Sequence, residues 1–223
     1  MKEKALVLLS GGMDSSVCLL IAKKEYKFDI FALTFDYGQR HRIEVEKAKE
    51  IAKKYSAKKH FIIELPLSKI GGSALTDKNI EVPEGKINRN EIPLTYVPAR
   101  NIIFLSYATA IAEVNEIYNI FIGVNYIDYS GYPDCRPEFI EAFEKMINLG
   151  TKSGVEGKKF KIYTPLIKMT KKEIVLKGKE LGLDFKLTHS CYNPDENGNP
   201  CGKCDSCLLR LKGFKEAGIE PVL

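Results

Sequence analysis

The chain has 223 residues, a length that fits one globular domain able to bury a core without disulfide support. Hydrophobic residues make up 44% and charged residues 28%, which excludes a disordered or fibrous protein. The formal net charge of +5 is small, and the lysines and arginines of residues 42–59 are interspersed with glutamates. This pattern favours a solvated helix face over a nucleic-acid patch.

The first apolar run covers only residues 5–9 and no cleavage site follows it, which argues against a signal peptide or a membrane span. We therefore expect a cytoplasmic protein with no membrane partner. The six cysteines would then be thiols rather than a disulfide framework, so those that cluster are interpreted as metal ligands.

Strand and helix patterns alternate along the chain. The predicted strands cover residues 5–9, 28–35, 60–65, 119–124 and 160–163, and the predicted helices cover 17–26, 39–56, 99–115, 137–149 and 170–182. This alternation predicts an α/β fold, an open, mainly parallel sheet with helices on both faces. Thr170 and Glu173 form a capping-box pattern that opens the last of these helices. From 68 to 95 the periodicity stops, which predicts a long functional loop or a mobile lid.

Residues 10–16, Ser-Gly-Gly-Met-Asp-Ser-Ser, join the first strand to the first helix. A helix N-terminus carries unpaired N–H groups and a partial positive charge, so this turn is a prepared site for phosphate. The glycines allow close approach of the backbone, the serines add hydroxyl donors, and Asp14 can cap the helix and help hold Mg²⁺. The predicted nucleotide-binding residues of the turn are Leu9, Ser10, Gly11, Gly12, Met13, Asp14, Ser15 and Ser16.

This turn lacks the Gly-Lys-Ser/Thr ending of a Walker loop and the dinucleotide glycine fingerprint. The alternative is a strand–helix connection with an aspartate cap and no ligand, which the ordered combination of strand, glycines, aspartate and serines disfavours. The pattern resembles the pyrophosphate-loop ATPases, which cleave ATP between the α and β phosphates. The resemblance implies adenylation, with AMP and pyrophosphate released.

Four cysteines near the C-terminus, Cys191, Cys201, Cys204 and Cys207, follow the spacing C-x9-C-x2-C-x2-C. The two-residue gaps let neighbouring sulfurs converge on one ion, and the loop 194–200 can return the first cysteine as a fourth tetrahedral ligand. Four thiolates leave no open position, so we predict one structural Zn²⁺; the alternatives are an iron–sulfur cluster or a thioredoxin-like redox pair. The site defines a zinc-binding helical appendage over 186–223, following a nucleotide-binding catalytic domain over 1–185.

Other residues with reactive side chains are expected to have less specific roles. His189 is interpreted as a hydrogen-bonding or active-site neighbour of the cysteines rather than a ligand. Cys18 is expected in the core, and Cys135 as an inert loop thiol, with a nucleophile as the alternative. Lys168 either contacts phosphate or is solvated, and the solvated interpretation is favoured.

Three further motifs lie between the phosphate turn and the cysteines. They are Phe-Asp-Tyr-Gly-Gln-Arg-His at 35–41, Val-Pro-Ala-Arg-Asn at 97–101, and Ser-Gly-Tyr-Pro-Asp-Cys-Arg-Pro-Glu-Phe at 130–139. In this order, and over nearly the whole chain, they resemble the 7-cyano-7-deazaguanine synthase family, the nitrile-forming enzymes of the queuosine and archaeosine pathways.

The resemblance implies an adenine nucleotide alpha-hydrolase-like fold and a ligase that joins 7-carboxy-7-deazaguanine to ammonia at the expense of ATP. Turning a carboxylate into a nitrile removes both oxygens, so each must be activated. Adenylation of the carboxylate, and then of the resulting amide, provides this activation. No glutaminase segment is visible, which favours free ammonia as the nitrogen source.

Two motifs are expected to contact the nucleotide. By resemblance, Arg100 and Asn101 contact ATP or the adenylate. The residues after the second strand lie where ligands bind to open parallel sheets; they are Tyr37, Gln39, Arg40 and His41.

The third motif is expected to recognise the base. A guanine-like edge offers N–H donors to a carboxylate, so Asp134 is the first candidate, with Asp128 and Glu138 in reserve; alternatively, Asp134 only shapes the helix entry. Arg136 can pair with the carboxylate or with phosphate. The predicted catalytic residues are Asp14, Arg100, Asp134 and Arg136.

Two other functions compete with this one. A related loop enzyme that modifies tRNA would need a basic extension, and none is visible. A zinc-ribbon module that binds RNA would place arginine and aromatic residues among the cysteines, whereas residues 191–207 are mostly Asn, Pro, Gly and Asp. We therefore expect small-molecule substrates and no nucleic-acid partner. The chain is also expected to form a homodimer.

Overall fold

The computed structural model describes residues 2–85, 91–127 and 131–223 and is built around one sheet. Five parallel strands lie in the order β3-β2-β1-β4-β5. Their bounds are β1 Lys4–Leu8, β2 Asp29–Asp36, β3 Lys59–Glu64, β4 Asn119–Phe121 and β5 Lys161–Tyr163. The prediction of an open, parallel α/β sheet is confirmed.

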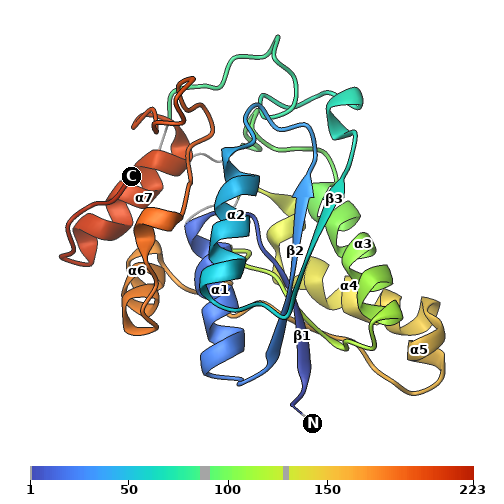
Figure 1. Cartoon of the computed structure of the whole chain (residues 1–223). Helices are drawn as coiled ribbons and strands as arrows, with labels where there is room; N and C mark the ends of the chain where they lie inside the picture. The colour runs from blue at the N-terminus through green and yellow to red at the C-terminus, as the bar shows by residue number, and fades with distance from the viewer. Residues whose placement is uncertain (1, 86–90, 128–130) are drawn as a thin grey trace.

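Side chains of the central strand β1 divide between two cores. Because successive side chains of a strand point to opposite faces, Ala5 and Val7 pack on one side and Leu6 and Leu8 on the other. The first face is covered by α1 (Met13–Lys24), α2 (Ile43–Lys54), α6 (Lys171–Glu180) and α7 (Asp205–Glu216). The second is covered by α3 (Arg100–Val114) and α4 (Pro137–Gly150), and Figure 1 shows α2 and α3 on opposite sides of the sheet.

Most predicted element boundaries lie within a few residues of the observed ones. The short elements α5 (Lys152–Val155), η1 (Leu67–Lys69), η2 (Pro133–Cys135) and η3 (Phe185–Leu187) were not predicted. The capping box of α6 is confirmed, because the Glu173 backbone N–H donates to Thr170 Oγ1 at 3.3 Å and the Thr170 N–H donates to Glu173 Oε2 at 2.7 Å.

The described part of the 68–95 segment is bonded to the rest of the chain. The Arg40 guanidinium donates to the carbonyl oxygens of Ala74 (2.5 Å), Asp77 (3.0 Å) and Ile80. Farther along, the Gly85 N–H donates to Lys203 O at 2.8 Å. These bonds favour a fixed loop over a mobile lid for the described residues.

The C-terminal segment shares a core with the sheet. Phe214 of α7 is fully buried in the cluster that α1 and α6 form, and its ring contacts Phe185 edge to face at 5.0 Å. The division at 185/186 stays a prediction. Among the described residues, none of the helices combines the length and apolar character that crossing a membrane requires.

Candidate functional site

A cavity of about 280 Å³ opens where β1, β2 and β4 end. It lies where the chain, having placed β2 and β3 on one side of β1, crosses to β4 on the other side. Ligands of open parallel sheets bind at this switch point, beyond the carboxyl ends of the strands. Its wall combines residues from α1, α2, α3 and α6 with the segment around His189.

The predicted phosphate turn forms one wall of the cavity. Gly11 has a φ of 84°, and a Cβ on it would lie 2.2 Å from the backbone oxygen of Glu44, so only glycine fits against α2 there. Ser10 Oγ and Ser15 Oγ lie 3.0 Å apart and both line the cavity. The first N–H groups of α1 therefore face the cavity beside two hydroxyl groups, as phosphate binding requires.

Two roles that we predicted for this turn are corrected by the structure. Asp14 does not cap α1, because Gly12 occupies the N-cap position; the Asp14 carboxylate instead forms an ion pair with Lys171. Ser16 does not face the cavity, because it is fully buried and its hydroxyl donates to Gly12 O at 2.7 Å. The residues of the turn that line the cavity are Leu9, Ser10, Gly12, Met13, Asp14 and Ser15.

Lys171 is a cavity residue that sequence reasoning missed. It is the first residue of α6, and the Thr170 cap fixes its position opposite the phosphate turn. The capping box marks this helix start in the sequence, and it is the feature from which the position of Lys171 could have been predicted. Lys168, for which a phosphate contact was the other interpretation, is exposed, in agreement with the solvated interpretation.

Residues of the 35–41 motif reach the cavity by different routes. The Tyr37 ring lies 5.9 Å from the Arg100 guanidinium, and burial raises the pKa of Tyr37 to about 12. Gln39 Oε1 accepts the Tyr37 N–H at 2.8 Å. Arg40 lines the cavity, but its guanidinium is bound to the loop carbonyls described above. His41 Nε2 lies 3.1 Å from Cys191 O and connects this motif to the cysteine segment.

Arg100 and Asn101 begin α3 and line the cavity, and their contact with ATP stays a prediction. The Asn101 backbone N–H donates to Asp134 Oδ2 at 2.9 Å, and Asn101 Nδ2 donates to Asp134 O at 3.1 Å. Asp134 is buried and does not line the cavity. Its carboxylate accepts at the start of α3, whereas the alternative concerned the entry of the helix that begins at Pro137, so the role of Asp134 stays a prediction.

The rest of the 130–139 motif lies partly outside the cavity. Arg136 and Glu138 are exposed at the start of α4 and do not line it. Asp128 lies outside the described residues. Cys135 does line the cavity, but burial raises the pKa of its thiol to about 12, in agreement with an inert thiol. Cys18 is buried in the core, as predicted.

Aromatic side chains form the wall beyond Arg100. Phe104 stacks on Phe35 with ring centroids 4.1 Å apart, and Tyr37 meets Phe104 at 5.5 Å. All three line the cavity together with Tyr132 and Tyr192. Such a wall suits a planar heterocycle.

His189 joins the phosphate turn to the cysteine segment. Its backbone N–H donates to Gly11 O at 2.9 Å. Burial, reinforced by the neighbouring His41, lowers the pKa of His189 to about 4. Arg210, another cavity residue missed from the sequence, is buried and donates to Thr188 Oγ1 at 2.8 Å and to Ser190 Oγ at 3.0 Å.

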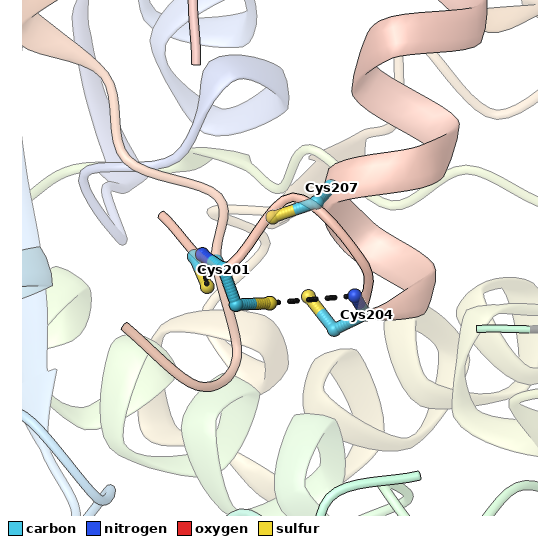
Figure 2. Close-up of side chains that lie close together, drawn as sticks. Cys201, Cys204 and Cys207 are labelled. Carbon is cyan, nitrogen blue, oxygen red and sulfur yellow. Dashed lines mark hydrogen bonds between the residues drawn. The ribbon is translucent and has the colours of Figure 1, made fainter. Parts of the chain in front are cut away.

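The four predicted metal ligands converge. The sulfur atoms of Cys191, Cys201, Cys204 and Cys207 lie within 4.8 Å of one another, and Figure 2 shows the last three gathered at the start of α7. Four Zn–S bonds of about 2.3 Å in a tetrahedron place the sulfurs about 3.8 Å apart, so this cluster has the scale of a metal site.

Backbone N–H groups surround these sulfurs. Cys191 Sγ accepts from Asn193 N at 3.3 Å and from Cys201 N at 3.2 Å, and Cys204 Sγ accepts from Tyr192 N at 3.4 Å. Such donors favour the thiolate form that binds metal and fix the direction of each ligand. The four cysteines therefore fit a closed metal site.

Similarity to known proteins identifies the family of this chain. The family described as queuosine biosynthesis protein QueC matches residues 4–218. A relative from Citrifermentans bemidjiense is 59% identical over all of this chain and 98% of its own length, and one from Desulfatibacillum aliphaticivorans is 58% identical over 98% and 94%. Both are named 7-cyano-7-deazaguanine synthase.

Solved structures share the fold at much lower identity. The U34-tRNA thiolase NcsA from Methanococcus maripaludis, solved with its [4Fe-4S] cluster, matches 97% of this chain and 68% of its own at 18% identity and a TM-score of 0.51. The NMN synthetase from Francisella tularensis matches 98% of this chain and 74% of its own at 16% identity and a TM-score of 0.52. These likenesses concern the fold alone, whereas the match over residues 4–218 and the curated relatives show that the chain belongs to the QueC family of queuosine biosynthesis proteins.

Proposed function

We propose that this protein is a 7-cyano-7-deazaguanine synthase, which converts 7-carboxy-7-deazaguanine and ammonia to the nitrile with ATP. The observation that carries the proposal is a phosphate turn without a Walker lysine that faces a cavity at the switch point of the sheet. The name shared by the curated relatives supports the substrate.

The reaction requires two activations of oxygen. The substrate carboxylate attacks the α phosphorus of ATP, pyrophosphate leaves, and ammonia then displaces AMP to give the primary amide. The amide oxygen is adenylated in turn, and expulsion of AMP leaves the nitrile. Because ammonia adds to carbon and ATP is cleaved, the enzyme is a ligase that forms a C–N bond.

The cavity residues supply charges suited to these steps. The N–H groups of α1, with the Ser10 and Ser15 hydroxyls, bind the leaving pyrophosphate, where charge develops. Lys171, which forms an ion pair with Asp14, neutralises a phosphate oxygen, and Asp14 would hold Mg²⁺. Arg100 faces the same space and contacts the adenylate, while the wall of Phe104 and Tyr37 stacks a planar ring.

The cysteine site binds one structural Zn²⁺ in our proposal. Four thiolate ligands with backbone N–H donors around them fill a tetrahedral ion and leave no position for substrate. Metal analysis of the purified protein separates this assignment from an iron–sulfur cluster: one zinc per chain and no visible absorption are expected, and stoichiometric iron would refute it.

The remaining properties follow from the same function. The substrates are small molecules, so we propose an enzyme of the cytoplasm without a nucleic-acid partner, acting as a homodimer. Sedimentation of the purified protein with and without tRNA tests both the dimer and the absence of tRNA binding.

The decisive experiment supplies the purified protein with Mg-ATP, ammonium and 7-carboxy-7-deazaguanine. We expect the nitrile, AMP and pyrophosphate, detected by mass spectrometry, and no nitrile when ammonium is omitted. ADP as the sole nucleotide product, or no product that depends on the substrate, would contradict the proposal.

Asp14→Asn provides the inactive control. It removes the negative charge that faces Lys171 while keeping the shape of the side chain. Turnover should fall by about 10³-fold or more, with the metal content unchanged. Loss of metal from this variant would show that Asp14 supports the fold rather than the reaction.

A further inference from the structure

Glu44 contributes a carboxyl group to the cavity from the first turn of α2. Its backbone oxygen packs against Gly11 of the phosphate turn, which places this helix turn directly beside the nucleotide site. The acidic residues that line the cavity within the described ranges are Asp14 and Glu44. Asp14 is engaged by Lys171, whereas no described residue donates a hydrogen bond to the Glu44 carboxylate.

The surroundings of Glu44 bring the pKa of its carboxyl close to neutral pH. Burial raises the pKa of its carboxyl to about 7, although the charge of Arg100 acts in the opposite direction. Two other acidic groups of the cavity, the Tyr37 phenol and the Cys135 thiol, have pKa values of about 12 because burial disfavours their anions. General bases act best when their pKa is close to the operating pH.

The proposed reaction, on which this inference rests, needs such a group. Nitrogen enters as ammonia with three N–H bonds and leaves in a nitrile with none. In the last step the adenylated amide loses AMP: the C–O bond breaks, the N–H bond breaks, and its electron pair completes the C≡N bond. The phosphoryl oxygen leaves with the electrons of the C–O bond, and the proton must go to an acceptor.

We propose that the Glu44 carboxylate is the catalytic base that accepts this last N–H proton. Arg100 faces the same part of the cavity, and its cation stabilises the negative charge that develops on the departing AMP. Glu44 thus acts at the nitrogen, where the N–H bond breaks, and Arg100 acts at the phosphoryl oxygen, where the C–O bond breaks. Glu44 then returns the proton to solvent before the next turnover.

The test uses the full chain and starts from the primary amide of the substrate with Mg-ATP, so that only the second half of the reaction is measured. In Glu44→Gln, the kcat for nitrile formation should fall by about 10²-fold or more, while the KM for the amide stays within about threefold. Glu44→Asp keeps a carboxylate and should retain more activity than Glu44→Gln. The matched control is Glu46→Gln, an exposed residue of the same helix turn whose change should leave kcat unaltered.

Each alternative outcome has a separate meaning. Nitrile formation by Glu44→Gln at the wild-type rate would overturn the role of Glu44. An unchanged kcat with a raised KM would also overturn it, and would instead identify Glu44 as a residue that binds the base edge. If the wild type makes no nitrile from either the amide or the carboxylate, the proposed function itself fails.

Discussion

The cavity and the cysteine site lie side by side but have opposite kinds of bonding. At the cysteine site, each sulfur is directed at its neighbours and several accept backbone N–H groups, so the potential ligands are arranged around one point. In the cavity, polar groups have unmet requirements among the described residues: His189 Nε2 is buried without a hydrogen-bond partner, and the Glu44 carboxyl has a raised pKa.

This difference indicates that the cysteine site stabilises the fold, whereas the cavity binds a ligand. Four sulfur ligands around one point stabilise a single arrangement of the chain. Unpaired charges and polar groups reduce stability, and they are retained where a ligand binds to them. Among the described residues, hydrogen bonds that connect the regions include those from His189 N to Gly11 O and between His41 Nε2 and Cys191 O. The metal site is therefore expected to hold one wall of the cavity in place without contacting the substrate.

Removing the metal should have the largest effect. Cys204→Ser takes one thiolate from the cluster, so we expect the metal content to fall from one ion per chain to nearly none. The free energy of unfolding should drop by more than about 3 kcal/mol, because metal binding contributes directly to folding. Metal analysis and chemical denaturation measure both, and Cys135→Ala, a cysteine outside the cluster, should keep the metal. A metal-free variant with full stability and turnover would break the assignment of a structural role.

Removing a cavity charge should give the reverse pattern. In Lys171→Met the Asp14 carboxylate loses its partner. In the proposed reaction, a phosphate oxygen also loses its cation. We expect turnover to fall by about 10²-fold with the metal content unchanged. Lys171→Arg keeps the charge but not the shape, so its turnover should lie between that of the wild type and that of Lys171→Met. Steady-state kinetics with varied ATP provide the measurement, and an unaltered rate in Lys171→Met would remove Lys171 from the phosphate site.

Contiguous motifs explain why part of this site could be predicted. The turn at 10–16 and the C-x9-C-x2-C-x2-C run each hold their groups within one short segment, so spacing alone located them. Glu44, Lys171 and Arg210 reach the cavity from separate elements. The capping box marks the helix start beside Lys171, but no neighbouring residue distinguishes Glu44 or Arg210 from solvated charges. Their roles depend on the packing of α2, α6 and α7 around β1, which periodicity does not specify.

Tertiary contacts also explain the roles that were assigned incorrectly. An aspartate in the first turn of a helix is a common cap, but Gly12 takes the N-cap position and leaves Asp14 free to meet a lysine more than 150 residues away in sequence. Similarly, Asp134 was predicted to recognise a base because the N–H donors of a guanine-like edge can bind to a carboxylate. In the fold its carboxylate accepts the N–H of Asn101 at the start of another helix.

The smallest expected effect is on the free energy of unfolding, and it tests whether ionised Glu44 destabilises the ligand-free protein. Glu44 has a folded pKa of about 7, above its ordinary value of 4.5, so the native state binds the proton more tightly than the unfolded state does. Ionised Glu44 therefore destabilises the fold above pH 7, and the penalty disappears as the pH falls toward 4.5.

Glu44→Gln removes this penalty and should stabilise the ligand-free protein at pH 8 by about 1 to 3 kcal/mol. The gain should shrink at pH 5.5, where the wild-type carboxyl is largely protonated. Urea denaturation of both proteins at the two pH values gives the difference, in which shared effects such as weaker metal binding in acid cancel. Glu46→Gln should show no such dependence because its side chain is exposed. A gain that is equal at both pH values would mean that the carboxyl is not strained by its surroundings, and the contrast between a closed metal site and an unsatisfied cavity would lose its clearest example.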